Sequence, residues 1–287
     1  MSDTVTGAAM AGRNEKFTVT VWGVRGSTPL CGGEFARYGG NTTCIEMRCG
    51  GEVLIFDAGT GIVTAGKRLV GEAVGEIHLF LTHSHYDHVQ GLPFFAPLYK
   101  PHTRACIASG HLEGRMSTRD VLAQLMRPPL FPIDPGYLKA DIRYLDFRPG
   151  DRLEPAPGIA IETARLNHPG GAVGYRVTFA GKSVAIVTDT EHVPGELDAN
   201  VLRLIENTDL FLYDASYGDE EMGKYAGFGH SSWQQAIRLA SVAKARHIGL
   251  IHHSFFHTDS DLDRIGELAR ARFDRVDVVR DGQVFDI

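Results

Sequence analysis

LTHSHYDHVQG, residues 81–91, places four side chains that can bind a metal, His83, His85, Asp87 and His88, on one short loop. The apolar run that precedes it, residues 77–81, predicts a buried strand, and Gly91 ends the loop. Imidazole nitrogen and carboxylate oxygen are ligands that suit zinc, and also manganese or iron(II). A buried aspartate among several histidines would otherwise need partners or a shifted pKa. The stretch therefore predicts a metal site at the end of a strand.

The composition is that of an ordinary globular protein. The chain has 287 residues, of which 43% are hydrophobic and 22% are charged, and a chain of this length buries roughly three quarters of its unfolded surface. Residues 1–16 lack the basic and apolar regions of a secretory signal, so we expect a flexible tail there. We expect residues 17–287 to form one domain, with an irregular, proline-rich flap or insertion at about 110–140.

Charge and cysteine content restrict the expected location and partners. No apolar run approaches the roughly 20 residues that span a bilayer, so we expect no membrane partner. The four cysteines form no C-x-x-C pair, which favours free thiols in a reducing cytoplasm. The formal net charge is −6 and neither Lys nor Arg is clustered. This argues against a nucleic-acid partner, because proteins that bind nucleic acids usually carry a basic stripe.

Hydrophobic periodicity predicts an α/β protein, with strands in two series and helices late in each half. This order fits two mixed sheets packed face to face with helices outside. Around Asp281-Gly282 we expect a terminal hairpin, and we expect Ser260 with Asp263 to cap the last helix. The expected helices are 117–126, one that Ser231 or Ser232 caps, and 262–273. The expected strands are 17–22, 43–48, 53–57, 77–81, 105–109, 142–146, 159–165, 173–179, 183–187, 210–213, 247–251, 276–280 and 283–287.

The pattern H-x-H-x-D-H after a strand resembles the signature of the metallo-β-lactamase superfamily. The resemblance runs from about Phe17 to the C-terminus and implies the four-layer αβ/βα sandwich of that superfamily, with the metal loops along one edge. Further donors follow other expected strands, in N-H-P-G, T-D-T and I-H-H-S segments. The resemblance implies two divalent ions, with zinc expected and manganese or iron as alternatives. It assigns His83, His85 and His168 to one ion, Asp87, His88 and His252 to the other, and Asp189 to a bridge between them.

The residues alone leave the choice between His252 and His253 open. Adjacent strand residues point to opposite faces, so only one of the two is expected to reach a metal. The H-x-S pattern of related phosphodiesterases places the ligand at His252.

Gly229-His230-Ser231-Ser232 resembles the G-H-S-T element of the tRNA 3′-processing endonucleases and their phosphodiesterase relatives. Asp214 stands where those relatives carry an acidic partner, with Asp in place of the usual Glu. His230, kept cationic by Asp214, could protonate a leaving alkoxide as general acid. The structural alternative is a histidine at the start of a helix beside a structural aspartate.

The implied nucleophile is a hydroxide held between the metals, with its pKa lowered toward about 7. Asp87 would orient or deprotonate it in addition to binding metal. Arg25 and Asn41 lie in Gly-rich segments whose backbone could approach an anion, so both are candidate substrate contacts. Turn formation is the other explanation of those glycines.

We therefore expect a dinuclear metal-dependent hydrolase, a phosphodiesterase acting on a small phosphodiester such as a cyclic nucleotide. The tRNA enzymes carry a basic arm that grips tRNA, and this chain has a short Pro/Phe-rich flap instead. Four aromatic residues could stack a base there: Phe94, Phe95, Phe131 and Tyr137. A lactone or ester hydrolase of the same fold and a catalytically silent metal-binding sensor are the alternatives. Relatives are often dimers, so a homodimer is one candidate assembly, and the sequence leaves the number of subunits open.

Overall fold

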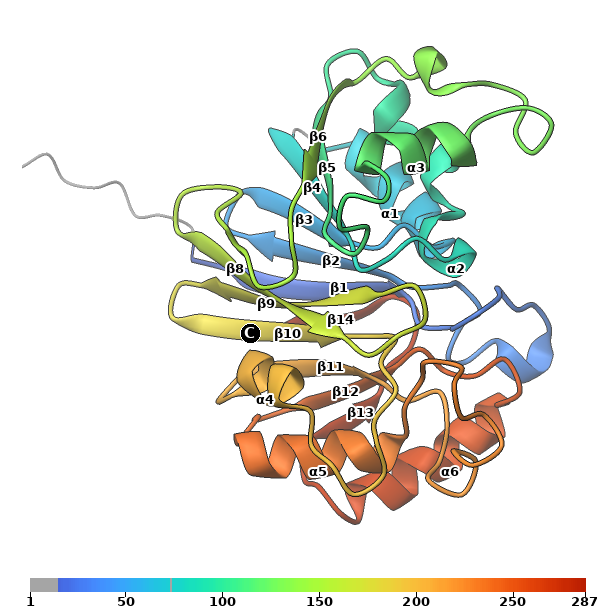
Figure 1. Cartoon of the computed structure of the whole chain (residues 1–287), viewed down its shortest axis with the longest axis vertical. Coiled ribbons are helices and arrows are strands. Elements are labelled where there is room, and N and C mark those ends of the chain that lie inside the picture. Colours follow the sequence, from blue (N-terminus) through green and yellow to red (C-terminus); the bar gives the residue numbers. More distant parts are fainter. Residues whose placement is uncertain (1–14, 73) are drawn as a thin grey trace, which may run out of the picture.

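Two seven-stranded sheets face each other and carry helices on their outer surfaces (Figure 1). The computed structural model describes residues 15–72 and 74–287, so the predicted tail, residues 1–16, lies outside the described residues except for Glu15 and Lys16. The predicted α/β class and four-layer sandwich are confirmed. That residues 17–287 fold as one independent domain stays a prediction.

The first sheet combines the N-terminal strands with the last strand of the chain. Strands β3 to β6 run parallel to one another, whereas β14, β1, β2 and β3 are antiparallel. In spatial order the strands are β14 (Gln283–Asp286), β1 (Phe17–Gly23), β2 (Cys44–Cys49), β3 (Glu52–Phe56), β4 (Glu76–Leu81), β5 (Arg104–Ser109) and β6 (Asp141–Asp146).

The second sheet mirrors this arrangement with later strands. Strands β10 to β13 are parallel, and β7, β8, β9 and β10 are antiparallel. Its order is β13 (Val276–Val278), β12 (Ile248–Ile251), β11 (Leu210–Asp214), β10 (Lys182–Val187), β9 (Ala172–Phe179), β8 (Ile159–Leu166) and β7 (Arg152–Leu153).

The main core lies between the sheets and is built from the inward-facing residues of both. Val19, Phe56 and Tyr175 are fully buried there, and the rings of Phe56 and Tyr175 approach with centroids 5.1 Å apart. The strands therefore alternate residues that fill this core with residues that meet the helices outside.

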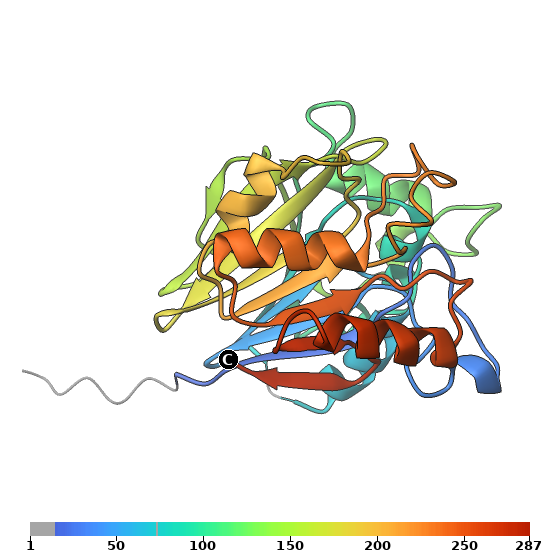
Figure 2. The ribbon, with the colours of Figure 1, turned by 90° about the horizontal axis from the view of Figure 1, so that it is seen from below.

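Helices cover both outer faces. Against the first sheet lie α1 (Gly61–Val70), α2 (Tyr86–Val89) and α3 (Thr118–Leu125). Against the second sheet lie α4 (Ala199–Ile205), α5 (Trp233–Ala243) and α6 (Asp259–Arg270). Figure 2 shows α5 and α6 alongside one another over the second sheet. No helix in residues 15–72 and 74–287 combines the length and the apolar character that crossing a bilayer requires.

The strand pattern positions the site. Strand β8 is antiparallel to β9, and β9 is antiparallel to β10, so β8, β10, β11 and β12 all end at the same edge of the second sheet. The loop after β4 begins at the facing edge of the first sheet. The two sheet edges lie next to each other at this point (Figure 1). Segments from distant parts of the sequence thus meet in one place.

Two details of the predicted secondary structure are wrong. Residues 276–287 form no hairpin, because β13 pairs with β12 in one sheet and β14 with β1 in the other, so Asp281-Gly282 crosses between the sheets. The last helix is capped by Thr258 with Asp261, whose side chains and backbone amides bond reciprocally, and not by Ser260. Reciprocal bonding of this kind satisfies amides that a helix start leaves unpaired.

The sequence pattern also missed α1 and α4. Gly66 sits inside α1, where a Cβ atom would lie 2.8 Å from the ring of Phe95. Glycine weakens a helix but here permits a close approach to the loop after α2. The segment predicted as a flap, 110–140, contains α3 and a short 3-10 turn at Pro135–Tyr137 among irregular backbone.

Candidate metal centre

Seven imidazole and carboxylate side chains converge where the two sheet edges meet. They form two groups, and within each group the candidate ligand atoms lie within 4.8 Å of one another. His83 and His85 come from the loop after β4, whereas His168, Asp189 and His252 follow β8, β10 and β12. The first group is His83, His85 and His168, and the second is Asp87, His88, Asp189 and His252.

Asp189 lies between the two groups, with one carboxylate oxygen toward each. Its Oδ1 is 3.1 Å from Nε2 of His88 and 3.2 Å from Nε2 of His252. Its Oδ2 is 3.7 Å from Nε2 of His83 and 3.8 Å from Nε2 of His168. This is the arrangement that a carboxylate shared by two cations requires.

The backbone at two of these residues is unusual. Asp189 has a φ of 56° and His252 a φ of 58°, in the left-handed region that non-glycine residues rarely occupy. Such residues cost about 1–3 kcal/mol and occur preferentially at functional sites. The backbone of Asp189 and His252 is therefore strained, in a conformation that directs both side chains toward the donor groups.

The donors fit a divalent cation. Nε2 of His83 is buried and has no hydrogen-bond partner among the residues that the structure describes. An unpaired buried polar atom is costly and calls for an explanation. Nδ1 of His85 and Nε2 of His168 also face each other at 3.0 Å beside it. An ion held by these three nitrogens would satisfy all of them, in the N-donor environment that zinc prefers.

Electrostatics prepare the ligands for a metal. Burial lowers the pKa of His83, His85 and His168, so their imidazoles are neutral and their nitrogens free to bind. Burial alone would raise the pKa of Asp189, but the neighbouring imidazoles, His252 first, hold it well below its usual range. The first donor group thus offers three neutral nitrogens, and the carboxylate of Asp189 beside it is ionised.

Four of the five ligand rings, those of His83, His88, His168 and His252, are held by a second hydrogen bond, and sequence reasoning missed these partners. Asp57 follows β3 just as Asp189 follows β10, which is the signal that could have found it. Bonds of this type set the tautomer and orientation of a metal-binding histidine. The ring nitrogen pairs are His88 with Asp57 Oδ2 at 2.8 Å, His83 with Thr82 Oγ1 at 3.0 Å, His168 with the Gly229 carbonyl at 2.8 Å, and His252 with Ser216 Oγ at 3.0 Å.

The structure separates His252 from His253. His252 points into the second donor group, whereas Nε2 of His253 lies 2.9 Å from the carbonyl of Val279, away from the cluster. Gly26, in the glycine-rich loop nearby, must lack a side chain, because a Cβ there would lie 2.2 Å from the ring of His252. That glycine makes room for the ring.

His230 and Asp214 form a pair beside the donors. Nδ1 of His230 is 3.0 Å from Oδ2 of the fully buried Asp214. Ser216 donates to the other oxygen of Asp214 at 2.7 Å. Burial opposes the charged imidazolium, but Asp214 and then Asp189 outweigh it and raise the pKa of His230 to about 9. His230 is therefore a proton carrier in contact with a fixed anion.

Arg25 and Asn41 do not reach the donor groups. Arg25 is fully buried, and its guanidinium donates to the carbonyls of Gly39 at 2.9 Å and His257 at 2.7 Å. The Asn41 side-chain amide donates to Asp281 at 3.0 Å. In place of the expected substrate contacts, the geometry gives both residues the role of tying loops together. Nη2 of Arg25 has no hydrogen-bond partner among the described residues, but it lies 3.8 Å from a carboxylate oxygen of Asp259.

A cavity of about 510 Å³ opens beside the donors. Tyr86 and Phe228 line it and are 72% and 60% exposed. The remaining lining residues are Ser27, Ser84, His85, Asp87, His168, Asp189 and His230. The cavity gives a ligand direct access to both donor groups and to His230.

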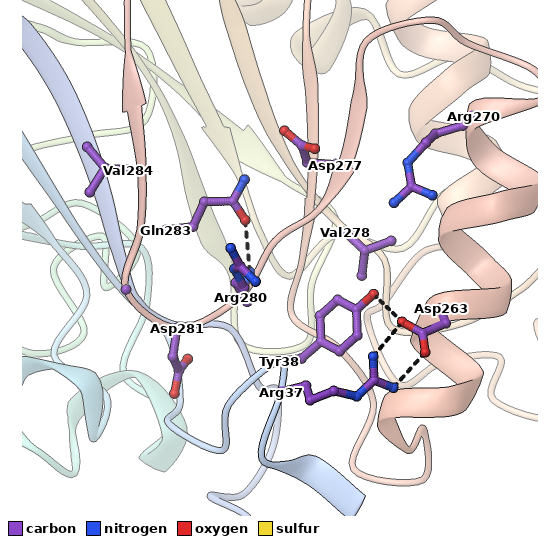
Figure 3. Close-up of a pocket in the computed structure, with 11 residues that line it drawn as sticks. Arg37, Tyr38, Asp263, Arg270, Asp277, Val278, Arg280, Asp281, Gln283 and Val284 are labelled. Carbon is purple, nitrogen blue, oxygen red and sulfur yellow. Dashed lines mark hydrogen bonds and ion pairs between the residues drawn. The ribbon is translucent and has the colours of Figure 1, made fainter.

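A larger cavity, about 770 Å³, lies elsewhere, between α6, β13 and the turn before β14 (Figure 3). Its wall carries Tyr38, whose hydroxyl donates to Asp263, and Arg37, whose guanidinium pairs with the same carboxylate. None of the seven candidate ligands lines it. Volume alone therefore does not locate the chemistry of this molecule.

Comparison with known proteins decides the family. Residues 53–253 match the family described as "Beta-lactamase superfamily domain". The chain belongs to the metallo-β-lactamase superfamily. Two relatives named Ribonuclease Z are similar: that of Treponema pallidum is 24% identical over 88% of this chain and 93% of its own length. That of Natronomonas pharaonis is 25% identical over 75% of this chain and 82% of its own length.

Solved structures show the same superfamily fold. The metallo-β-lactamase fold protein YhfI from Bacillus subtilis superposes with a TM-score of 0.70 at 20% identity, covering 95% of this chain and 100% of that one. A diphosphatase from the PhnP family gives a TM-score of 0.69 at 18% identity, covering 95% and 97%. The predicted resemblance is confirmed, and this superfamily member is a metal-dependent hydrolase.

One prediction about partners is wrong. The negative charge predicts no nucleic-acid partner, yet the relatives just described are ribonucleases by name. Net charge sums over the whole surface, whereas a substrate meets only the charges of one site, and cations bound there would change the local sign. The formal charge of −6 therefore does not exclude RNA as a substrate of this superfamily member.

Proposed function

We propose that this protein is a dinuclear metal-dependent phosphodiesterase. The observation that carries the proposal is the His230–Asp214 pair, 3.0 Å apart, whose imidazole lines the same cavity as the two donor groups. Cleavage of a phosphodiester needs positive charge at the phosphate and a proton for the leaving oxygen. The two donor groups would hold the cations that supply this positive charge, and the His230–Asp214 pair would supply the proton.

The first ion would be held by His83, His85 and His168 and the second by Asp87, His88 and His252, with Asp189 shared. Two divalent ions, zinc first with manganese or iron as alternatives, would neutralise the nonbridging phosphate oxygens and lower the pKa of water there. The side chains of the protein keep these positions rigid, since the ligands sit at strand ends and their rings are hydrogen-bonded from behind.

Asp87 orients the attacking water. The backbone amide of Ser27 donates to its Oδ2 at 2.7 Å, which fixes the carboxylate in the cavity. His88 and the side chain of His252 oppose the effect of burial and keep the pKa of Asp87 below its usual value. The carboxylate is therefore ionised, can accept a hydrogen bond from water, and holds that water beside the phosphorus.

His230 protonates the leaving oxygen. Its Nδ1 is held by Asp214, so its Nε2 is the ring nitrogen left to carry a proton to the substrate. Asp214 fixes the ring and stabilises the imidazolium before the transfer. A leaving alkoxide needs this proton, because an alkoxide is a poor leaving group at neutral pH.

The substrate class we propose is a nucleotide phosphodiester, and a small diester of the cyclic-nucleotide type is one candidate. RNA is a candidate of equal standing, because relatives with the name Ribonuclease Z match most of the chain. Both contain the same scissile group.

The test is a substrate panel with zinc- or manganese-loaded protein. The panel contains bis-p-nitrophenyl phosphate, 2′,3′- and 3′,5′-cyclic nucleotides, an RNA with a 3′ extension, and a lactone. Turnover of at least one diester with a strong preference over the lactone supports the proposal. Turnover of the lactone alone, unchanged in His230→Ala, would show that the site is a carboxylic ester hydrolase.

A further inference from the structure

An apolar groove of about 540 Å³ runs beside the cavity of the metal centre and shares Ser84 and Tyr86 with it. One wall comes from the segment that holds the metal ligands and the turn after it, with Tyr86, Val89, Pro93 and Phe94. The other wall comes from the flap. The flap residues that line it are Leu112, Met116, Val121, Gln124, Leu125, Leu130 and Phe131.

The groove is uncharged and open. No described residue that lines it carries a charge, in contrast to the adjoining cavity with its two aspartates. Tyr86 and Phe94 of one wall and Leu130 of the other are 72%, 58% and 76% exposed. Large apolar side chains gathered in the open mark a binding surface more often than single exposed ones do.

The structure sorts the four aromatic residues that were candidates for stacking a base. Phe94 and Phe131 line the groove and meet edge to face, with ring centroids 5.6 Å apart. Phe95 is 1% exposed in the core below, and Tyr137 is exposed but does not line the groove. Only two of the four can therefore contact a ligand there.

We propose that this groove holds the base of a nucleotide whose phosphate lies at the metal centre. Three observations carry the inference: the groove continues into the metal cavity, its walls are apolar and aromatic, and it carries no charge. A base is flat, uncharged and apolar on its faces, and stacks on aromatic side chains regardless of sequence. The side-chain amides of Gln90 and Gln124 line the groove. Each donates one hydrogen bond within the protein, to Thr42 and Met116, and has a second N–H and an oxygen that could meet the polar edge of a base.

This inference rests on the proposed function for the position of the phosphate, so its test separates the two. The first measurement is binding, by calorimetry with the zinc-loaded protein. The ligands are thymidine 5′-monophosphate and 2-deoxyribose 5-phosphate, which share the sugar phosphate but carry a base and a hydroxyl, respectively, at C1′. The groove predicts that the thymidine compound binds about tenfold more tightly, which corresponds to 1.4 kcal/mol.

Two groove variants and one control make the measurement specific. Phe94→Ala and Leu130→Ser each change an exposed side chain that lines the groove and not the metal cavity. The tenfold preference for the base should fall below about threefold in each of them. Tyr137→Ala removes an exposed aromatic ring of the same flap outside the groove and should keep the full preference.

The second measurement is turnover of p-nitrophenyl diesters that share a leaving group. Thymidine 5′-(p-nitrophenyl phosphate) should be cleaved with about tenfold higher kcat/KM than methyl p-nitrophenyl phosphate, and the two groove variants should lose that ratio. Base-dependent binding without turnover of any diester would leave the groove in place and refute the phosphodiesterase. Turnover of the diesters with no preference for the base would refute the base-binding groove and leave the phosphodiesterase in place.

Two arms distinguish the source of the base. Loss of kcat/KM in the groove variants with the dinucleotide uridylyl-uridine assigns the groove to small diesters. Loss that is seen only with a longer RNA assigns it to RNA. Equal binding of the two matched phosphates by the unmodified protein would overturn the proposal. So would a dimer that dissociates in Leu130→Ser while the preference for the base is unchanged, since the groove would then bind a second copy of this chain.

Discussion

Oδ2 of Asp214 lies 3.0 Å from Nδ1 of His230, and the hydroxyl of Ser216 donates to the other oxygen of the same carboxylate at 2.7 Å. Ser216 also lies 3.0 Å from Nδ1 of His252. One serine hydroxyl thereby connects the proton donor of the proposed reaction to a ligand of the proposed second metal. The acid and the metal centre are parts of one hydrogen-bonded unit.

The first prediction concerns the general acid. His230→Ala should lower kcat for a diester with an alkoxide leaving group by about 10²–10⁴-fold, the usual contribution of general acid–base catalysis. A diester with a p-nitrophenolate leaving group should lose much less, because that group leaves without a proton. Metal content, measured by elemental analysis, should stay unchanged. Equal losses for both substrates would contradict the assignment of the proton to His230.

The second prediction concerns pH. A general acid acts in its protonated form, which is present below its pKa, so kcat/KM should decline as the pH rises through the pKa of His230. That value is about 9 in the geometry described, raised by Asp214, Asp189 and Asp87. Bound cations would compensate Asp189 and Asp87, which places the decline between the ordinary histidine value of about 6.5 and about 9. In Asp214→Asn the decline should move to lower pH; a profile identical to that of the unmodified protein would argue against the pair.

The third prediction concerns ring orientation. Ser216→Ala removes the hydroxyl that holds Nδ1 of His252 at 3.0 Å. Loss of such a partner usually weakens metal affinity by about 10–100-fold, and the effect should fall on one ion of the two. Titration with a competing chelator measures it. Ser241→Ala, which changes a serine of α5 away from the site, is the matched control and should bind both ions normally.

The fourth prediction separates stability from substrate binding at Arg25. Arg25→Ala leaves carbonyl acceptors and the nearby carboxylate of Asp259 without their cation, and should lower the free energy of unfolding by about 3–5 kcal/mol. Arg37→Ala, which breaks an exposed ion pair with Asp263, should change the free energy of unfolding much less, because water screens that pair. Denaturant melts of the two variants give the comparison. If the Arg25→Ala protein is as stable as the unmodified protein but has a greatly raised KM, Arg25 contacts the substrate as the sequence predicted.

The sequence predicted the donor groups because they follow strands in fixed local patterns. His83, His85, Asp87 and His88 are close in sequence, and the resemblance added the three distant donors. Arg25 could not be placed in this way, since its partners, the carbonyls of Gly39 and His257, are backbone atoms of loops that only the folded chain brings together.

The terminal strands show a similar limit. Val276–Val278 and Gln283–Asp286 read as a hairpin because a tight turn separates two apolar runs, but each pairs with a strand of a different sheet. Local pattern gives strands and turns, whereas pairing is decided by partners far away in the chain. Ser216 and Thr82 were missed for a related reason, since a hydroxyl carries no signal until the ring beside it is known.

The central claim is that two cations share Asp189, and an anomalous-scattering crystal structure of the zinc-loaded protein tests it most directly. The account predicts two zinc peaks, one bound by His83, His85 and His168 and the other by Asp87, His88 and His252, with one oxygen of Asp189 on each. In Asp189→Ala at least one peak should disappear. A single peak that does not touch Asp189, or no peak at these side chains after loading, would contradict the account.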